Sequence, residues 1–157
     1  MTLSAQSFGT VVDLFHRASG IRLTAAKKPL VEGRLQKLAA DRGMPDLDRY
    51  VQWLVSERDA DETRKVIDKL TTNETYFFRE PQHFDLLKRL SVDHPAGGEA
   101  YRVWSAASST GEEAFSIAMV LADKLGRRPW EIVGTDLSSQ VVAAARTGLS
   151  PLDRARD

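Results

Sequence analysis

The first 70 residues carry apolar positions at helical spacing, and no segment among them alternates with a period of two. Between Phe8 and Ala18 apolar residues recur every three or four positions until Gly20, a residue type that commonly ends helices. The same spacing predicts three further helices: one from Thr24 to about Gly43, one with Asp46 as its N-cap, and one that turns Val66, Ile67 and Leu70 inward. We therefore expect residues 1–70 to form a small all-α domain.

The pattern changes after residue 70. Residues 71–79 (TTNETYFFR) mix hydroxyls, an amide and aromatic rings without amphipathic order, and we interpret them as the joint between two domains. Beyond the joint we predict a helix that begins at Pro81, a strand over 101–105, a helix that opens at Gly111, a strand over 130–137 and a helix over 138–146. The predicted inward residues are Phe84, Leu87 and Leu90 in the first helix, and Ala114, Ile117, Ala118, Leu121, Ala122 and Leu125 in the second. Alternating strands and helices predict an incomplete α/β domain over residues 71–157, with two parallel strands.

Composition and charge exclude several classes of partner and site. Lys plus Arg and Asp plus Glu each total 22, so the chain has no overall field that would hold nucleic acid or an anionic membrane. The absence of cysteine excludes disulfides, thiolate catalysis and cysteine-bound metal, and the three histidines have no metal-ligand spacing. No apolar run approaches the ~20 residues that span a bilayer, and we do not expect the first residues to form a signal peptide. We expect a cytoplasmic protein.

Acidic residues follow both predicted strands, where an open parallel sheet binds its ligands. The first strand runs into residues 105–113 (SAASSTGEE), whose small side chains let a ligand approach the start of a helix. The alternative is a turn with two acids that suit the helix dipole. This turn lacks the glycine patterns of dinucleotide and P-loop sites, and its acids would repel phosphate. A nucleoside without phosphates fits better than a dinucleotide.

Asp136 comes just after residues 132–134, the centre of the second predicted strand, and about 20 residues beyond the first loop. A carboxylate in this position can accept hydrogen bonds from both hydroxyls of a ribose. The alternative role is an N-cap for the helix that follows. The two acidic strand ends together favour a ribose-bearing ligand that is neutral or positively charged.

Three blocks of sequence, in order, carry a resemblance to a known family. Residues 70–80 (LTTNETYFFRE), 101–116 (YRVWSAASSTGEEAFS) and 134–138 (GTDLS) are similar to the CheR family of chemotaxis receptor methyltransferases. The resemblance implies a helical domain followed by a Rossmann-like methyltransferase domain that binds S-adenosylmethionine (SAM) and releases S-adenosylhomocysteine. It also implies methyl transfer to glutamate side chains on the cytoplasmic helices of chemoreceptors.

The resemblance also assigns roles to residues of the joint and of the two strand ends. It implies that Asn73, Thr75, Arg79, Glu113 and Asp136 contact the cofactor, with Asp136 on the ribose and Glu113 near the cationic methionine end. Arg79 is the expected catalytic residue, because it could hold the receiving carboxylate ionised. Its alternative role is a surface ion pair with Glu80 or Asp85.

Basic residues of the second helix are expected to bind the substrate. The resemblance suggests that Lys27, Lys28, Arg34 and Lys37 face the acidic receptor helix, and their spacing could place several on one face. An ordinary solvated helix face is the alternative.

An α/β domain with only two strands leaves apolar surface without a partner. We therefore expect that the chain associates with itself through this domain, is completed by another polypeptide, or belongs to a longer protein. The competing function is a noncatalytic module that binds acidic helical partners and keeps a vestigial half of a cofactor site.

Overall fold

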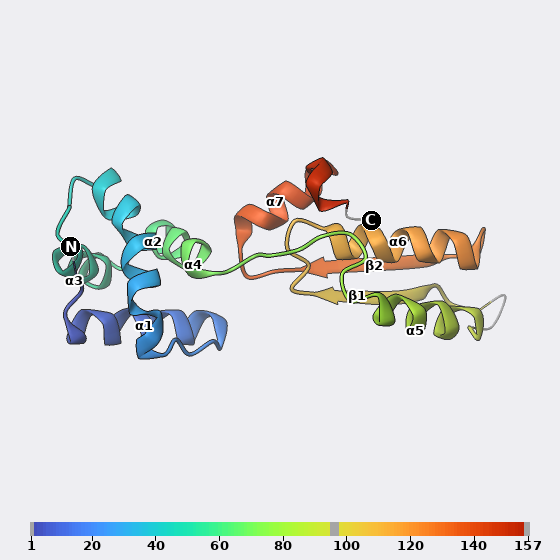
Figure 1. Ribbon diagram of the computed structural model, residues 1–157, viewed down its shortest axis with the longest axis horizontal. Coiled ribbons are helices and arrows are strands. Elements are labelled where there is room, and N and C mark those ends of the chain that lie inside the picture. The colour runs from blue at the N-terminus through green and yellow to red at the C-terminus, as the bar shows by residue number, and fades with distance from the viewer. Residues whose placement is uncertain (1, 95–97, 156–157) are drawn as a thin grey trace. The chain divides into compact units, whose positions relative to one another are not determined.

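A computed structural model describes residues 2–94 and 98–155 of the chain. These residues fall into two compact units, Met1–Thr72 and Asn73–Asp157, and each is described by itself. The first unit is all-α, and the second is a partial α/β unit with two parallel strands (Figure 1). The predicted fold class is thereby confirmed, while the predicted boundary between residues 70 and 71 stays a prediction.

The helical unit is built from short amphipathic helices with well-formed ends. Ser4, Asp46 and Asp59 are N-caps whose side chains accept hydrogen bonds from backbone N–H groups of the first turn, which confirms the cap predicted at Asp46. Gly20 ends the first helix in the left-handed conformation, with φ of 74°. The elements are α1 (Ala5–Ser19), a 3-10 turn η1 (Ala25–Lys27), α2 (Lys28–Asp41), α3 (Leu47–Glu57) and α4 (Ala60–Leu70).

Large apolar side chains fill the interior of the helical unit. Phe15, Leu35 and Leu54 are at most 2% exposed, and helices α1 to α4 all contribute to this one cluster. Full burial of such a side chain contributes about 1.5–3 kcal/mol. The core of this unit is therefore closed by its own helices.

The second unit pairs two parallel strands and packs helices beside them. Its elements are α5 (Pro81–Val92), β1 (Tyr101–Ala106), α6 (Glu112–Leu125), β2 (Trp130–Thr135), α7 (Ser139–Thr147) and a 3-10 turn η2 (Leu152–Arg154). The register runs from Tyr101 opposite Trp130 to Ala106 opposite Thr135. Because the strands are parallel, both end at the same edge of the sheet.

One face of the sheet is covered and the other is open among the described residues. Helices α5 and α6 pack on the covered face, where Leu121 is fully buried beside Val103 and Ile132. Successive strand residues point to opposite faces. Accordingly Trp104, next along β1, is 69% exposed, and Val133 is 44% exposed.

Some details of the predicted α/β elements were wrong. The second strand ends at Thr135 and not at residue 137. Leu90 is 53% exposed and Ala122 is exposed, whereas Ser116 and Val120 are buried. The side of α6 that faces α5 and the sheet is therefore rotated from the predicted stripe. No helix in the described part of the chain is long and apolar enough to cross a membrane.

Candidate cofactor site

The loop between β1 and α6 has an unusual backbone. Ala107, Ser109 and Gly111 have positive φ angles of 63°, 50° and 100°. Residues other than glycine rarely adopt this conformation, and they cluster at ligand sites when the surrounding structure holds them there. The loop lies at the carboxyl edge of the sheet, where parallel α/β sheets bind their ligands.

This loop is held tightly against the end of β2. The backbone N–H of Ser108 donates to the carbonyl of Thr135 at 2.8 Å. A Cβ added to Gly134 would lie 2.9 Å from Ser108 Oγ, closer than real Cβ atoms approach. Gly134 is therefore required for the close approach of loop and strand.

Asp136 lies directly after β2 and connects to the same loop. Its Oδ2 accepts a hydrogen bond from Ser109 N and its Oδ1 accepts one from Ser138 N, both at 2.9 Å. The N-cap of α7 is Ser138, so the N-cap alternative for Asp136 is wrong. An ionised carboxylate has about four acceptor sites, so each oxygen of Asp136 keeps capacity for a further donor.

Glu113 is fixed in the first turn of α6. Its Oε1 accepts a hydrogen bond at 2.7 Å from Ser105 Oγ, and Ser105 is buried near the end of β1. The half-buried Glu113 side chain lines an apolar hollow of about 270 Å³ between α5, α6 and β1. Two carboxylates, Glu113 and Asp136, thus stand at the carboxyl edge of the sheet.

Ser109 offers a hydroxyl that the described protein leaves unused. The residue is 5% exposed, and its Oγ is the buried side-chain oxygen without a hydrogen-bond partner in the described part of the chain. A buried hydroxyl without a partner is costly, so such a group often marks a ligand position. No cluster of three or more metal-binding side chains occurs among the described residues. The donors and acceptors here suit a polar organic ligand.

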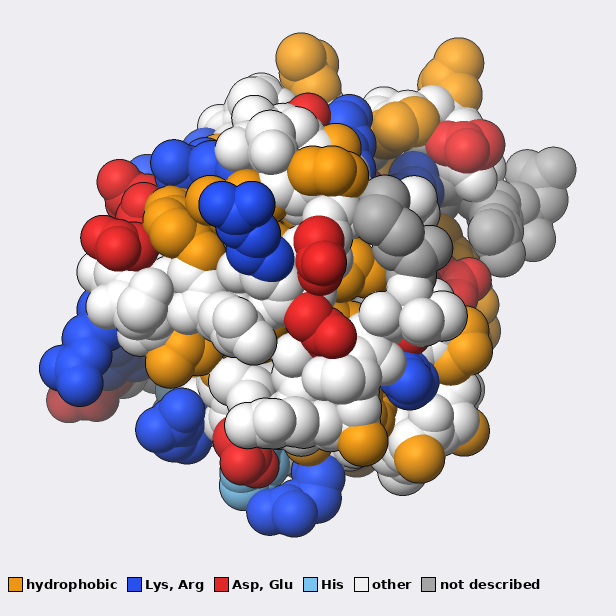
Figure 2. Space-filling model, turned by 90° about the vertical axis from the view of Figure 1, so that its left-hand side faces the viewer, with side chains coloured by type: hydrophobic (Ala, Val, Ile, Leu, Met, Phe, Trp, Pro, Cys, Tyr) orange, Lys and Arg blue, Asp and Glu red, His pale blue; other side chains and the backbone are white. Residues whose placement is uncertain are grey.

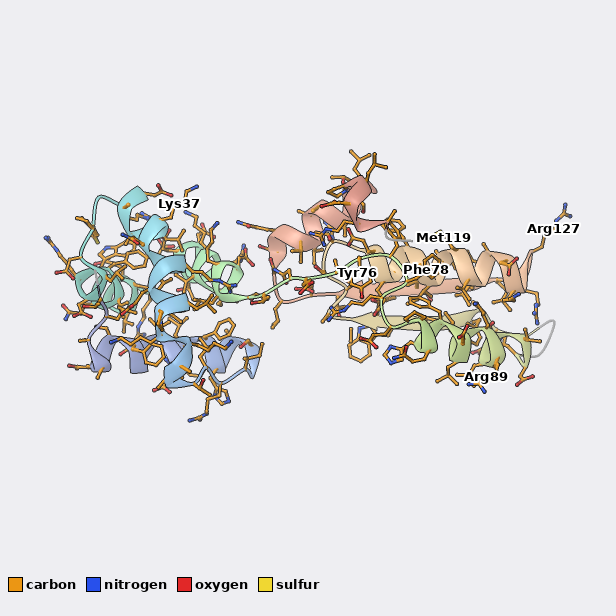
Figure 3. The ribbon with its side chains drawn as sticks, in the orientation of Figure 1. Lys37, Tyr76, Phe78, Arg89, Met119 and Arg127 are labelled. Atoms are coloured by element: carbon orange, nitrogen blue, oxygen red, sulfur yellow. The ribbon has the colours of Figure 1, made fainter. Side chains whose placement is uncertain are left out.

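The joint segment, residues 73–79, lies against α6 and η2. Phe77 N donates to Arg154 O at 3.0 Å, and the guanidinium of Arg154 donates to the carbonyl of the buried Thr75. Phe78 N donates to Ser116 Oγ at 3.0 Å. Figure 3 labels Tyr76 and Phe78 on this segment, with Met119 on the neighbouring helix α6. Asn73, at the start of the segment, is half-buried.

Arg79 is exposed and makes a local contact. Its Nη1 donates at 2.8 Å to the carbonyl of Glu74 in the same segment. The described residues show no ion pair of Arg79 with Glu80 or Asp85, which was the alternative role. The structure therefore places Asn73, Thr75 and Arg79 on one segment, and Glu113 and Asp136 on the sheet edge.

The four basic residues of the helical unit have different surroundings. Lys27 and Lys37 are exposed, and Lys28 lies 3.8 Å from Glu32. Arg34 instead turns to the end of α4, where it donates to the carbonyl of Leu70 at 2.8 Å and to Thr72 Oγ1 at 3.1 Å. On the face shown in Figure 2, Lys and Arg side chains are interspersed with Asp and Glu.

Two family descriptions match almost the whole chain. Residues 6–71 match the all-alpha domain of CheR methyltransferase, and residues 73–157 match its SAM binding domain. The chain belongs to the CheR methyltransferase family. The predicted resemblance is therefore confirmed, and the edge formed by Asp136 and Glu113 lies within the part that matches the SAM binding domain.

The chain is also similar to curated proteins from individual bacteria. The chain is 41% identical over 153 residues to the chemotaxis protein methyltransferase of Escherichia coli (strain K12), covering 95% of this chain and 52% of that protein. It is 39% identical over 153 residues to the chemotaxis protein methyltransferase of Salmonella typhimurium, covering 95% and 51%. It is 31% identical over 164 residues to that of Borreliella burgdorferi, covering 98% and 58%. The chain spans about half the length of the curated relatives it matches.

Several residues that organise this CheR-family site could not be selected from the sequence. Ser105, Ser116, Glu112 and Arg154 each hold a loop or another candidate residue through a hydrogen bond. Serines and acids in SAASSTGEE did indicate a polar turn. Arg154 had no such signal, because its partner Thr75 lies 79 positions away.

Proposed function

We propose that this chain supplies one wall of the SAM site of a protein-glutamate O-methyltransferase whose substrates are cytoplasmic helices of chemoreceptors. Membership of the CheR family and the names of the relatives support this proposal. The observation that carries it is the carboxylate of Asp136, held by two backbone N–H groups beside a loop with a buried, unused hydroxyl. Bound SAM would supply a methyl group from its positively charged sulfur. A carboxylate oxygen would accept the methyl group, and S-adenosylhomocysteine would be released.

Asp136 and Glu113 have complementary roles in this proposal. Asp136 accepts hydrogen bonds from the ribose hydroxyls with the acceptor capacity that Ser109 N and Ser138 N leave over. Glu113, oriented by Ser105, places a negative charge near the cationic methionine end of the cofactor. The two carboxylates favour such a ligand over a phosphate-bearing one, because like charges repel.

The joint segment completes the wall with neutral groups and one cation. Asn73 and Thr75 provide donors and acceptors for the amino-acid portion of the cofactor. Arg79 is the proposed catalytic residue: it uses one N–H on Glu74 and keeps other guanidinium N–H groups for a carboxylate. A guanidinium beside the receiving glutamate favours its ionised, nucleophilic form.

The substrate surface is proposed on the helical unit. Lys27, Lys28 and Lys37 are available to an acidic receptor helix, with Lys28 also near Glu32. Arg34 is included in the proposal, although its guanidinium also donates a hydrogen bond to the carbonyl of Leu70 at the end of α4. Long-range attraction between such charges and an acidic helix is weakened by salt.

Calorimetry with S-adenosylhomocysteine tests the cofactor site in this chain. Asp136→Ala and Glu113→Ala should each weaken binding about 10- to 100-fold, because a hydrogen bond to a charged group contributes about 1.5–3 kcal/mol. Asp85→Ala, which removes an exposed carboxylate of α5, is the control and should bind like the wild type. Equal binding by all four proteins would refute the proposed site.

Transfer of labelled methyl from SAM tests the activity. The assay compares this chain with a protein of the full family length, using a helical receptor peptide that contains glutamates and a matched peptide with those glutamates changed to glutamine. We expect transfer by the longer protein to the first peptide alone, and its loss in Arg79→Ala. Peptide binding without any cofactor binding or transfer would instead support the noncatalytic module.

Self-association through the α/β unit stays a prediction. The open face of its sheet exposes Trp104 and Val133 beside the ion pair of Arg102 and Glu131, and exposed apolar side chains of this kind favour association. Light scattering after size-exclusion chromatography, across a range of concentrations, measures it. A constant monomer mass would contradict the prediction.

A further inference from the structure

The joint segment, residues 73–79, is held by groups outside itself. It lies outside helices and strands, so its backbone N–H and C=O groups must find partners elsewhere. Within the segment, Arg79 donates to the carbonyl of Glu74. The described partners outside it are Ser116, whose Oγ accepts from Phe78 N at 3.0 Å, and Arg154, whose carbonyl accepts from Phe77 N at 3.0 Å and whose guanidinium donates to Thr75 O. The position of the segment therefore depends on how Ser116 and Arg154 are themselves fixed.

Ser116 is fixed by the backbone of Glu112. Its side chain is fully buried in α6, and its hydroxyl donates to the Glu112 carbonyl at 2.7 Å. A serine hydroxyl has one proton to donate, so this bond orients the oxygen as the acceptor for Phe78 N. A single hydroxyl thus links the first turn of α6 to the joint segment.

The second link also begins at Glu112, through its carboxylate. One oxygen accepts from Thr110 Oγ1 at 2.6 Å, and the other accepts from Ser150 Oγ at 3.1 Å. Ser150 lies just before η2, and η2 ends at Arg154. The first link therefore uses the backbone carbonyl of Glu112 and the second uses its carboxylate, so both pass through the first turn of α6.

Glu112 is an expensive residue to bury. It is 0% exposed, and no lysine or arginine forms an ion pair with it among the described residues. Hydroxyl donors and the positive end of the α6 dipole compensate for part of this cost. A glutamate in this environment needs a reason beyond packing, and the link from its carboxylate through Ser150 provides one.

The segment itself is strained where it is held. Phe78, and Glu80 directly after the segment, have positive φ angles of 54° and 61°, which are costly for residues other than glycine. The Phe78 ring packs edge-on against Phe84 of α5, with centroids 5.2 Å apart. Such a conformation persists only while the surrounding contacts hold it, so loss of the Ser116 bond should release the segment.

We propose that Glu112 and Ser116 are positioning residues that hold the joint segment, and with it Asn73, Thr75 and Arg79, in place at the cofactor site. The proposal rests on the proposed function for its consequence, namely tighter cofactor binding. Neither residue needs to contact the cofactor, since both act through the segment. The holding of the segment is measurable without any cofactor.

A pair of buried serines provides the test. Ser116→Ala leaves Phe78 N without its partner, and should speed amide hydrogen exchange at Phe77 and Phe78 about tenfold. Binding of S-adenosylhomocysteine should weaken about fivefold in the same variant. Ser91→Ala is the matched control: Ser91 is also fully buried, donates to Lys88 O at 3.0 Å in α5, and makes no bond to the segment. It should change neither exchange in the segment nor binding.

Arg154→Ala removes the guanidinium bond to Thr75 O but keeps the backbone carbonyl that accepts from Phe77 N. Arg154 is only half-buried, so the change does not hollow the core, and it should act in the same direction as Ser116→Ala. Wild-type exchange in both variants would overturn the proposal. Faster exchange with unchanged binding of S-adenosylhomocysteine would also overturn it, because the held position would then not serve the cofactor. If the wild type binds no S-adenosylhomocysteine, the proposed function fails, and hydrogen exchange alone decides whether these residues hold the segment.

Discussion

The helical unit and the α/β unit are stabilised in different ways. In the helical unit all four α-helices contribute to one closed core, and one of its buried carboxylates, that of Glu62, is paired with Tyr50, Arg42 and Lys65. In the α/β unit one sheet face is open, with Trp104 69% exposed, and the buried polar groups hold loops at the edge of the sheet. The first unit is organised around packing, and the second around a site.

The largest expected effect comes from truncating the closed core. Leu35→Ala should lower the free energy of unfolding of the helical unit by about 2–5 kcal/mol, because it leaves a cavity among rigid neighbours. Leu121→Ala, at an equally buried position, should cost nearer the lower limit, because surroundings beside an open sheet can collapse more easily. Urea unfolding followed by hydrogen exchange in peptides from each unit measures both.

Leu30→Ala is the control for that comparison. Leu30 lies on the same helix as Leu35 but is 39% exposed, so the change should stay within about 0.5 kcal/mol. Equal costs for Leu35→Ala and Leu121→Ala would remove the proposed difference between the two units.

Two glycines extend the comparison, because adding one methyl group should change the stability of the two units in opposite directions. Gly134→Ala would press a Cβ against Ser108 Oγ, and should destabilise the α/β unit by about 1–3 kcal/mol. Gly33→Ala meets nothing within 4 Å on α2, and should stabilise the helical unit by up to about 1 kcal/mol. The same measurement of hydrogen exchange in peptides from each unit gives both changes in stability. Destabilisation by Gly33→Ala would contradict the expected sign.

Acid should weaken the helical unit through Glu62. Burial alone would raise the pKa of Glu62, but hydrogen bonds from Arg42, Tyr50 and Lys65 outweigh it and lower the pKa below the ordinary 4.5. A lowered folded-state pKa gives stability that is fully present above pH 4.5 and is lost as the pH falls through the folded value.

Glu62→Gln isolates this contribution. At pH 7 it should cost about 1–2 kcal/mol, because the charge that accepts four hydrogen bonds from three residues is lost while an acceptor remains. The difference from the wild type should shrink below pH 4.5, as measured by urea unfolding at several pH values. A difference that does not change between pH 7 and pH 3 would contradict the sign of the pKa shift.

Periodicity predicted the elements of both units, but it predicted the buried side of α6 only in part: Ile117, Leu121 and Leu125 are buried as predicted. Ala122 fitted the expected stripe and is exposed, whereas Val120 lies off that stripe and is buried. The spacing of apolar residues defines a face of the helix only relative to the helix axis. How helix α6 is turned against α5 and the sheet depends on contacts between residues far apart in the sequence. Asp136 could be predicted as a candidate site residue because it comes after a strand, and its position in the sequence shows this directly. Its partner Ser109 depends on how the loop folds back over β2.

The smallest expected effect on stability separates two basic residues of α2. Lys37→Ala should change the free energy of unfolding by at most about 0.5 kcal/mol, because the side chain is exposed on the helix (Figure 3). Arg34→Ala should cost more, since its guanidinium binds carbonyls at the end of α4. Calorimetric titration with an acidic receptor peptide then tests the proposed substrate surface by measuring how tightly each variant binds the peptide.

In that titration Lys37→Ala should weaken binding about two- to fivefold at low salt, the range of an exposed ion pair. The difference should disappear at high salt, where such pairs are screened. Lys69→Ala, an exposed change on α4 outside the proposed surface, should bind like the wild type. If Lys37→Ala binds the peptide as tightly as Lys69→Ala at low salt, Lys37 lies outside the substrate surface, and the basic residues of α2 are a solvated helix face.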